Sequence, residues 1–129
     1  QERKAMILNL TQHPSTPEQK AAGVVDLPIS VRNELSALLT FDSLPTRQEL
    51  EDRAKRIAAI ATIYATGDEP TAMIGGAPFL TSVLEAILDY AGIKPVYAFS
   101  RRESVEETLP DGSVRKVNIF RHAGFVPAW

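Results

Sequence analysis

The chain has 129 residues, a length that suits one domain with a single hydrophobic core. Hydrophobic residues make up 44%, charged residues 23% and the net charge is −2, which argues against a disordered chain and against a basic surface for duplex DNA or RNA. It has no cysteine and no apolar run near the ~20 residues of a membrane span, so disulfides and membrane insertion are not expected. We expect one cytoplasmic domain over residues 1–129, with residues 1–4 disordered or added during cloning.

The first half of the chain alternates between strand and helix patterns. These are an apolar strand at residues 5–10, a helix at 17–22, a short strand at 24–27, a helix at 30–39 and a long helix at 47–65. Thr16 and Gln19 form a capping box that starts the first helix. Thr46 and Glu49 form another at the start of the long helix. Ser30 is expected to cap the helix between them.

The second half begins after Gly67, which is expected to cap the long helix. It contains a strand at residues 71–74, a helix at 79–91 and a strand at 96–99. Strands that alternate with helices predict an α/β fold. We expect a small Rossmann-like three-layer sandwich, in which helices cover both faces of a mainly parallel sheet.

The end of the chain predicts an antiparallel β-hairpin. Residues 102–109 and 113–120 flank the sequence Pro110-Asp111-Gly112, which suits a three-residue turn with Gly112 in the left-handed conformation. That turn sets a register in which apolar residues face each other and acidic residues face basic ones. The expected pairs are Val105 with Val117, Glu106 with Lys116 and Glu107 with Arg115.

Polar or glycine-rich segments follow three of the predicted strands, at residues 11–16, 75–78 and 100–103. In an open α/β sheet, ligands bind in the crevice beyond the carboxyl ends of the parallel strands. The three segments together offer hydroxyl, imidazole, glycine and guanidinium groups. They therefore predict a pocket for an anionic ligand.

Gly75, Gly76 and Ala77 lie between a predicted strand and a predicted helix. Glycine lets the backbone approach a ligand closely, and the amino end of a helix offers unpaired N–H groups that suit phosphate. A tight strand-to-helix turn would need the same glycines. The sequence leaves phosphate binding and a purely structural turn equally open.

Four further candidates carry a basic or imidazole group. His13 has no evident structural role in its loop and suits phosphate contact or acid–base catalysis, although a structural role is favoured. Arg101 and Arg102 suit phosphate, but neighbours on a strand point to opposite faces, so at most one of them faces the pocket. His122 either lines the same crevice or covers a sheet edge, and the second interpretation is favoured.

Four segments resemble motifs of small CRISPR-associated Rossmann-fold (CARF) proteins. Residues 10–19 contain the pattern His-x-x-Thr-x-x-Gln. Residues 97–106, 111–116 and 120–122 contain Arg-x-x-x-Glu, Asp-Gly-x-Val-x-Lys and Phe-x-His. These segments span most of the chain, whereas residues 30–65 match only loosely. The chain is similar to single-domain relatives of the CARF ring nucleases.

The resemblance implies an antiviral-defence protein that binds a cyclic oligoadenylate second messenger and, as many such proteins do, cleaves it without a metal ion or another cofactor. It assigns catalysis to His13, Arg102 and Ser100. The ligand-binding candidates are Thr11, Gln12, Thr16, Gln19, Gly75, Gly76, Ala77, Arg101 and His122. The chain departs from the resemblance where Thr11-Gln12 precede His13, because a serine–histidine pair is common there.

Two other functions stay open, namely a sensor or sponge that binds the nucleotide without cleaving it, and a protein–protein interaction module with no nucleotide ligand. A homodimer is expected, with the carboxyl ends of the strands near the two-fold axis, because one open sheet offers only half a pocket to a cyclic, symmetric ligand. No metal site is expected, since the two histidines lie more than a hundred residues apart and no carboxylate cluster accompanies them.

Overall fold

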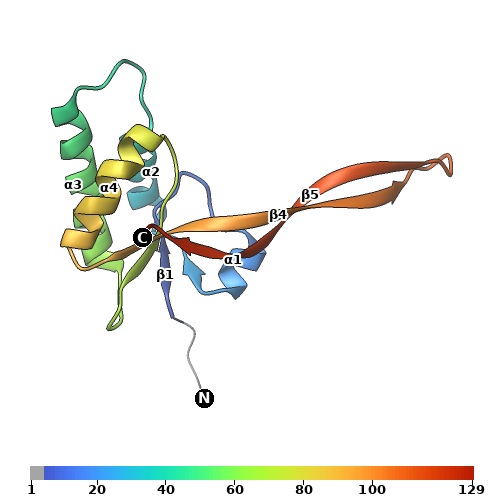
Figure 1. Ribbon diagram of the computed structural model, residues 1–129, viewed down its shortest axis with the longest axis horizontal. Coiled ribbons are helices and arrows are strands. Elements are labelled where there is room, and N and C mark those ends of the chain that lie inside the picture. The colour runs from blue at the N-terminus through green and yellow to red at the C-terminus, as the bar shows by residue number, and fades with distance from the viewer. Residues whose placement is uncertain (1–4) are drawn as a thin grey trace.

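The computed structural model describes residues 5–129, so the expectation for residues 1–4 lies outside the described residues. The described chain alternates strands and helices and ends in a long hairpin that projects from the body (Figure 1). Its elements are β1 (Ile7–Asn9), α1 (Pro17–Ala21), β2 (Val24–Val25), α2 (Ile29–Leu39), α3 (Arg47–Tyr64), β3 (Thr71–Met73), α4 (Pro78–Tyr90), β4 (Lys94–Thr108) and β5 (Val114–Pro127).

The strands form one mixed sheet in the order β2-β1-β3-β4-β5. Neighbouring strands from β2 to β4 are parallel, and β5 is antiparallel to β4. The predicted α/β class, the mainly parallel sheet and the C-terminal hairpin are therefore confirmed. The same strand order occurs in the flavodoxin-like folds, in which β5, unlike here, is parallel to its neighbour.

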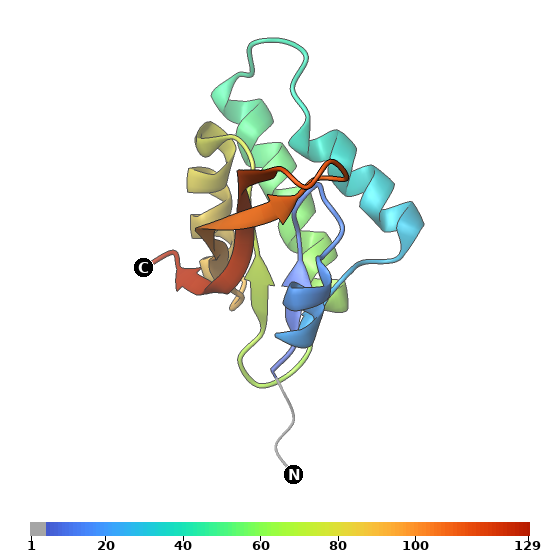
Figure 2. The same ribbon diagram turned by 90° about the vertical axis from the view of Figure 1, so that its right-hand side faces the viewer.

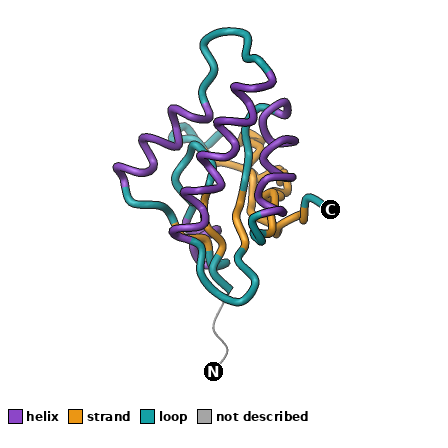
Figure 3. The backbone as a smooth tube through the Cα atoms, turned by 90° about the vertical axis from the view of Figure 1, so that its left-hand side faces the viewer, coloured by secondary structure: helices purple, strands orange, loops and turns teal. Residues whose placement is uncertain are grey.

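One face of the sheet carries most of the core. Figure 3 shows α2, α3 and α4 in front of the strands, and their apolar stripes pack with Leu8, Ala72 and Ile74 of the β1 and β3 segments. On α3, Leu50, Ala54, Ile57 and Ala61 are buried. The helix patterns thus arise from burial against this one face.

The opposite face is thinly covered. Its apolar cluster consists of Val24, Met73 and Val96, with Ile7 and Phe125 packed against it. The helix on this side is α1, which has five residues and buries none of them (Figure 2). The sheet curls as a half-barrel, so that β5 approaches α1. The predicted three-layer sandwich is not confirmed, because α1 is too short to form a layer.

Of the two predicted capping boxes, one is confirmed in full and the other in half. At α1, Gln19 N–H donates to Thr16 Oγ1 at 3.1 Å and Thr16 N–H donates to Gln19 Oε1 at 3.0 Å, which completes the capping box. At α3, Glu49 N–H donates to Thr46 Oγ1 at 3.1 Å. The Glu49 carboxylate instead pairs with Arg53 at 3.1 Å, so only half of the second box forms.

Two predicted caps are wrong. Helix α2 begins at Ile29, and Arg32 N–H donates to the Pro28 carbonyl at 2.9 Å, so Ser30 lies inside the first turn. The fixed φ of proline suits this entry into a helix without a side-chain cap. At the other end of α3 the cap is Ala65, and Gly67 follows in the loop with φ +98°.

The strand predicted to end at residue 99 continues without a break. Strand β4 runs to Thr108, and a β-bulge leaves Ala123 of β5 unpaired where the ladder passes from Phe99–Gly124 to Ser100–His122. The expectation of a polar loop at residues 100–103 is therefore wrong. Both faces of a projecting ribbon meet water, so polar residues there do not mark the end of a strand.

The hairpin register is confirmed, with Val105 opposite Val117. Gly112 N–H donates to the Leu109 carbonyl at 2.9 Å, and Leu109 N–H donates to the Ser113 carbonyl at 2.8 Å. Gly112 has φ +85°, the left-handed conformation that closes a three-residue hairpin turn. The Glu107–Arg115 pair forms an ion pair at 3.2 Å, and Glu106 lies opposite Lys116.

The different burial of Leu84 and Leu44 predicts that replacing each with alanine has very different effects on stability. Leu84 on α4 is fully buried, whereas Leu44 in the α2–α3 loop is 94% exposed. We expect Leu84→Ala to lower the free energy of unfolding by about 2–5 kcal/mol, because it leaves a cavity in the core. Leu44→Ala should change it by less than about 0.5 kcal/mol. Equal losses in chemical denaturation would contradict this placement of the core.

Candidate functional site

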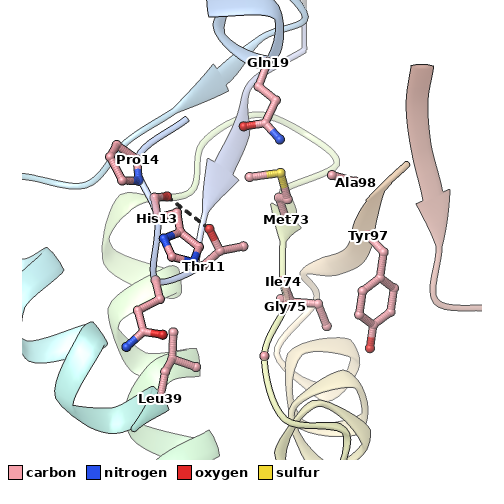
Figure 4. Close-up of a pocket in the computed structure, with 12 residues that line it drawn as sticks. Thr11, His13, Pro14, Gln19, Leu39, Met73, Ile74, Gly75, Tyr97 and Ala98 are labelled. Atoms are coloured by element: carbon pink, nitrogen blue, oxygen red, sulfur yellow. Dashed lines mark hydrogen bonds between the residues drawn. The ribbon is translucent and has the colours of Figure 1, made fainter. Parts of the chain in front are cut away.

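A cavity of about 380 Å³ opens at the carboxyl ends of β1 and β3. It is lined by Thr11, Gln12, His13, Pro14, Gln19, Leu39, Met73, Ile74, Gly75, Gly76, Tyr97 and Ala98. Figure 4 shows Gln19 and Met73 at one end and Leu39 at the other. The chain leaves β1 through α1 and reaches β2 on one side of β1, whereas β3 lies on the other side of β1. The cavity therefore occupies the topological switch point, where doubly wound folds bind ligands.

A polar clamp at the end of β1 fixes the first wall of the cavity. The buried Asn9 donates through Nδ2 to the His13 carbonyl at 2.8 Å and to Asp26 Oδ1 at 2.9 Å. Its Oδ1 accepts from Thr11 N–H at 2.9 Å. Asp26 in turn accepts from Ser15 N–H at 3.1 Å. The clamp holds the loop from both ends, so the lining side chains of Thr11 and His13 project from a fixed backbone.

Asp26 is the charged member of this clamp. Burial alone would raise the pKa of its carboxyl group. Hydrogen bonds from Asn9 and from Ser15, with the nearby Arg32 charge, outweigh burial and hold that pKa below its ordinary value. The carboxylate is therefore ionised at neutral pH and accepts the loop's hydrogen bonds.

The remaining polar walls come from three other elements. Gln12 Nε2 donates to Thr40 Oγ1 at 2.9 Å, at the end of α2, and Gln19 reaches the cavity from α1. The Tyr97 hydroxyl donates to Glu85 Oε2 of α4 at 2.6 Å. Burial and this hydrogen bond raise the pKa of Tyr97, so its phenol stays protonated. The cavity thus offers neutral donors and acceptors around an apolar wall.

The glycine segment forms the wall that faces Thr11. A Cβ atom at Gly75 would lie 3.5 Å from Thr11 Cγ2, so the two loops are in contact there. Gly76 has φ +120°, which an L side chain rarely adopts. Helix α4 follows with Ala77 as its N-cap and no side-chain cap. Pro78 has no N–H and Leu80 N–H donates to the Ala77 carbonyl at 3.0 Å, so Phe79 is the first-turn residue whose N–H has no backbone partner within residues 5–129. The turn requires glycine, and it also leaves amides beside the cavity.

Six of the predicted site residues line the cavity. They are Thr11, Gln12, His13, Gln19, Gly75 and Gly76. Thr16 and Ala77 lie at the N-caps of α1 and α4 instead. The other four lie outside it on the hairpin, where Ser100 is opposite His122, Arg101 opposite Arg121 and Arg102 opposite Phe120.

Side chains alternate between the two faces of β4, and this alternation shows which hairpin residues share a face with the residues that line the cavity. Ser100 and Arg102 follow Ala98 at two-residue intervals and share its face of β4, whereas Arg101 lies on the other face. His122 packs against Phe125, with ring centroids 4.8 Å apart, and its Nδ1 is buried with no partner among residues 5–129. Arg102 thus shares the face of Ala98, whereas Arg101 shares the face of Tyr97, and both Ala98 and Tyr97 line the cavity.

Sequence reasoning missed Asn9, Asp26 and Tyr97. Asn9 interrupts an otherwise apolar run, which was the available signal, because a polar residue at the end of a buried strand needs a partner. Asp26 and Tyr97 gave no comparable signal, since their role depends on contacts with β1 and α4.

Within the described part of the chain, no three His, Asp or Glu side chains are grouped so as to hold a metal ion. None of the helices in residues 5–129 has the length and apolarity needed to cross a membrane.

The chain matches the family described as "Uncharacterized protein MJ1673 family" over residues 5–126. It therefore belongs to that family. The description carries no reference to CRISPR-associated proteins or to nucleotides. No curated protein and no solved structure matches the chain.

The clamp predicts a pH-dependent contribution to stability. The pKa of Asp26 is lower in the folded chain than in the unfolded chain, so its carboxylate stabilises the fold above about pH 4. This stabilisation is lost as the pH falls through the lower, folded pKa. We expect Asp26→Asn to reduce the free energy of unfolding at pH 7 by about 1–3 kcal/mol, and the difference from the parent to shrink below about pH 4.

Urea denaturation at several pH values measures this difference. Asp68→Asn, in the exposed loop after α3, is the matched control and should follow the parent throughout. A deficit for Asp26→Asn that stays constant down to about pH 2 would contradict the clamp.

Proposed function

We propose that the protein binds a small anionic nucleotide, of the cyclic oligoadenylate class, at the carboxyl ends of its parallel strands. The observation that supports this most is the position of the cavity between β1 and β3. In doubly wound folds this switch point is where nucleotide ligands bind. The cavity volume of about 380 Å³ lies within the usual range of small-molecule sites.

The lining divides into two parts that suit the two parts of a nucleotide. Leu39, Met73 and Tyr97 give an apolar side for a base. On the other side, the backbone N–H groups of Gly75 and Gly76 line the cavity, and the Phe79 N–H lies in the first turn of α4. These are donors for a phosphate at a helix end whose dipole favours negative charge. Hydroxyl and amide groups from Thr11 and Gln19 complete the site.

A ring of several nucleotides exceeds a cavity of this size, so part of the ligand extends beyond it. The face of β4 that continues from Ala98 carries Ser100 and Arg102. Arg102 has no ion-pair partner among residues 5–129, so its guanidinium is available to a phosphate outside the cavity. We assign this role to Arg102 because it continues the face of Ala98 and Ser100, whereas Arg101 lies on the face of Tyr97.

The same groups support cleavage without a metal ion. The ribose 2′-oxygen attacks the adjacent phosphorus, the bond to the 5′-oxygen breaks, and the products carry a 2′,3′-cyclic phosphate and a 5′-hydroxyl. His13 accepts the proton of the 2′-hydroxyl and returns it to the departing 5′-oxygen, and this proton transfer contributes roughly 10²–10⁴-fold. Arg102 and the backbone amides stabilise the added negative charge. Binding without products would identify the protein as a sensor or sponge instead.

Variants of the cavity test the binding site. In a thermal-shift and calorimetric screen of cyclic and linear oligoadenylates, we expect the parent to be stabilised by a cyclic ligand. Gln19→Ala should weaken binding, because Gln19 lines the cavity from α1. Gln48→Ala, exposed on α3, should bind like the parent. Equal affinities for the two variants, or no stabilisation by any oligoadenylate, would refute the proposed site.

Variants of the two neighbouring arginines test whether turnover depends on a contact between Arg102 and phosphate or only on the positive charge of the hairpin. Arg102→Ala should lower turnover by about 10²–10³-fold, the usual cost of losing one donor to the transition state. Arg101→Ala removes the same charge on the other face and should change turnover far less.

Turnover should also survive EDTA, since the proposed chemistry uses protein groups alone. Chromatography of the products measures all three, and equal effects of the two arginine variants would contradict the assignment.

A further inference from the structure

The projecting hairpin leaves a long strand edge uncovered. Strand β4 pairs with β3 only over Lys94–Val96, so its outer edge from Tyr97 to Thr108 has no strand partner within residues 5–129. A two-stranded ribbon is marginally stable in water, and a long free edge is a template for another strand. A further strand would therefore stabilise the hairpin, and the unpaired backbone groups of β4 could form hydrogen bonds with it.

Charges along this edge are also left without partners. Arg101 lies opposite Arg121, and Arg121 is occupied by Glu103 at 2.7 Å. Like charges opposite each other on neighbouring strands are destabilising. Arg101, Arg102 and Glu106 have no ion pair within the described chain. A strand that paired with β4 and supplied opposite charges would remove this cost.

The sequence of β4 is itself such a strand. Arg101 and Arg102 lie three and two residues before Ser104, and Glu106 and Glu107 lie two and three residues after it. We propose that β4 pairs antiparallel with β4 of a second copy of this chain, with the two-fold axis at Ser104. Arg102 then faces Glu106 of the partner subunit, a carboxylate that a ligand phosphate bound to Arg102 would displace, and Arg101 faces Glu107 of the partner subunit.

Neighbouring registers fit worse. A shift of one residue, with Arg102 opposite Glu107 of the partner subunit, puts Glu103 opposite Glu106 of the partner subunit. A shift of two residues puts Glu103 opposite Glu107 of the partner subunit. The Ser104 register matches every Arg–Glu pair and opposes no like charges. An equivalent pairing of β5 with itself brings only the basic residues Arg115, Lys116 and Arg121 together.

The backbone permits the same register. Leu109 N–H donates to the Ser113 carbonyl, so the odd-numbered residues of β4 direct their backbone groups toward β5. The even-numbered residues, Ser104 among them, direct theirs to the free edge. Ser104 and its symmetry mate can therefore exchange both hydrogen bonds across the axis. The product is a four-stranded sheet of two hairpins, with opposite charges matched on both faces.

This arrangement also brings the second copy to the cavity. Ala98 lies six residues before Ser104, and Pro110 lies six residues after it. The turn of each hairpin thus lies beside Ala98 of the other subunit, at the rim of the cavity that Ala98 and Tyr97 line. A role for that turn in retaining the ligand rests on the proposed function, whereas the β4 pairing does not.

Cysteine crosslinking of the whole chain tests the register. The chain has no cysteine, so Ser104→Cys introduces a single thiol. Paired Cα atoms at the axis lie about 5.5 Å apart, within the range of a disulfide. Thr108→Cys is the matched control on the same face of β4. Its symmetry mate is eight residue steps away, about 26 Å. We expect mild oxidation to dimerise Ser104→Cys and not Thr108→Cys, and equal crosslinking of the two would overturn the register.

Charge exchange gives an independent readout by light scattering. The parent should be a dimer of the 14.1 kDa chain. Arg101→Glu with Arg102→Glu, and separately Glu106→Arg with Glu107→Arg, should each be monomeric, and an equimolar mixture should form a dimer again. Arg47→Glu with Lys55→Glu, on the exposed side of α3, changes the net charge as much as the first pair and should stay dimeric. A monomeric parent, or a mixture that stays monomeric, would overturn the proposal. Neither outcome depends on whether a nucleotide binds.

Discussion

The packing of α2, α3 and α4 on one face of the sheet determines which strand ends lie together. The connections from β2 to β3 and from β3 to β4 both cross on that face, whereas α1 crosses on the other. Because β2 and β3 lie on opposite sides of β1, the segments that follow β1 and β3 leave the carboxyl end of the sheet in different directions. The cavity between them follows from the order β2-β1-β3-β4-β5 and needs no special sequence of its own.

The residues around this gap then decide its chemistry. Asn9 and Asp26 hold the β1 loop by hydrogen bonds of about 3 Å, so its shape is set by groups that do not line the cavity. On the opposite wall, Gly76 gives a turn that brings backbone donors to the rim. Neither wall contributes an acidic side chain to the lining of the cavity, which suits an anion better than a cation.

Local signals made much of the fold predictable from the sequence. Thr16 with Gln19 and the turn at Gly112 act over three or four residues, so their geometry is encoded where they stand. The continuation of β4 past Phe99 was not predictable in this way, since an exposed ribbon has no buried face and hence no apolar alternation. Asp26 was missed for a related reason: its partner Asn9 is seventeen residues away, and only the fold brings them together. In the site, the glycines and the His13 loop followed from their position after strands, whereas the hairpin residues 100–102 depended on a loop that does not exist.

The central claim is that a cyclic oligoadenylate binds between the β1 and β3 loops, and amide NMR of the whole chain tests it most directly. Glycine amides resolve well, and the chain has seven glycines. Titration with the ligand should shift the Gly75 and Gly76 amide signals, which lie at the cavity. Gly67 and Gly92, which line separate hollows away from it, should stay in place. Shifts confined to Gly67 or Gly92, or no shift at saturating ligand, would contradict the account.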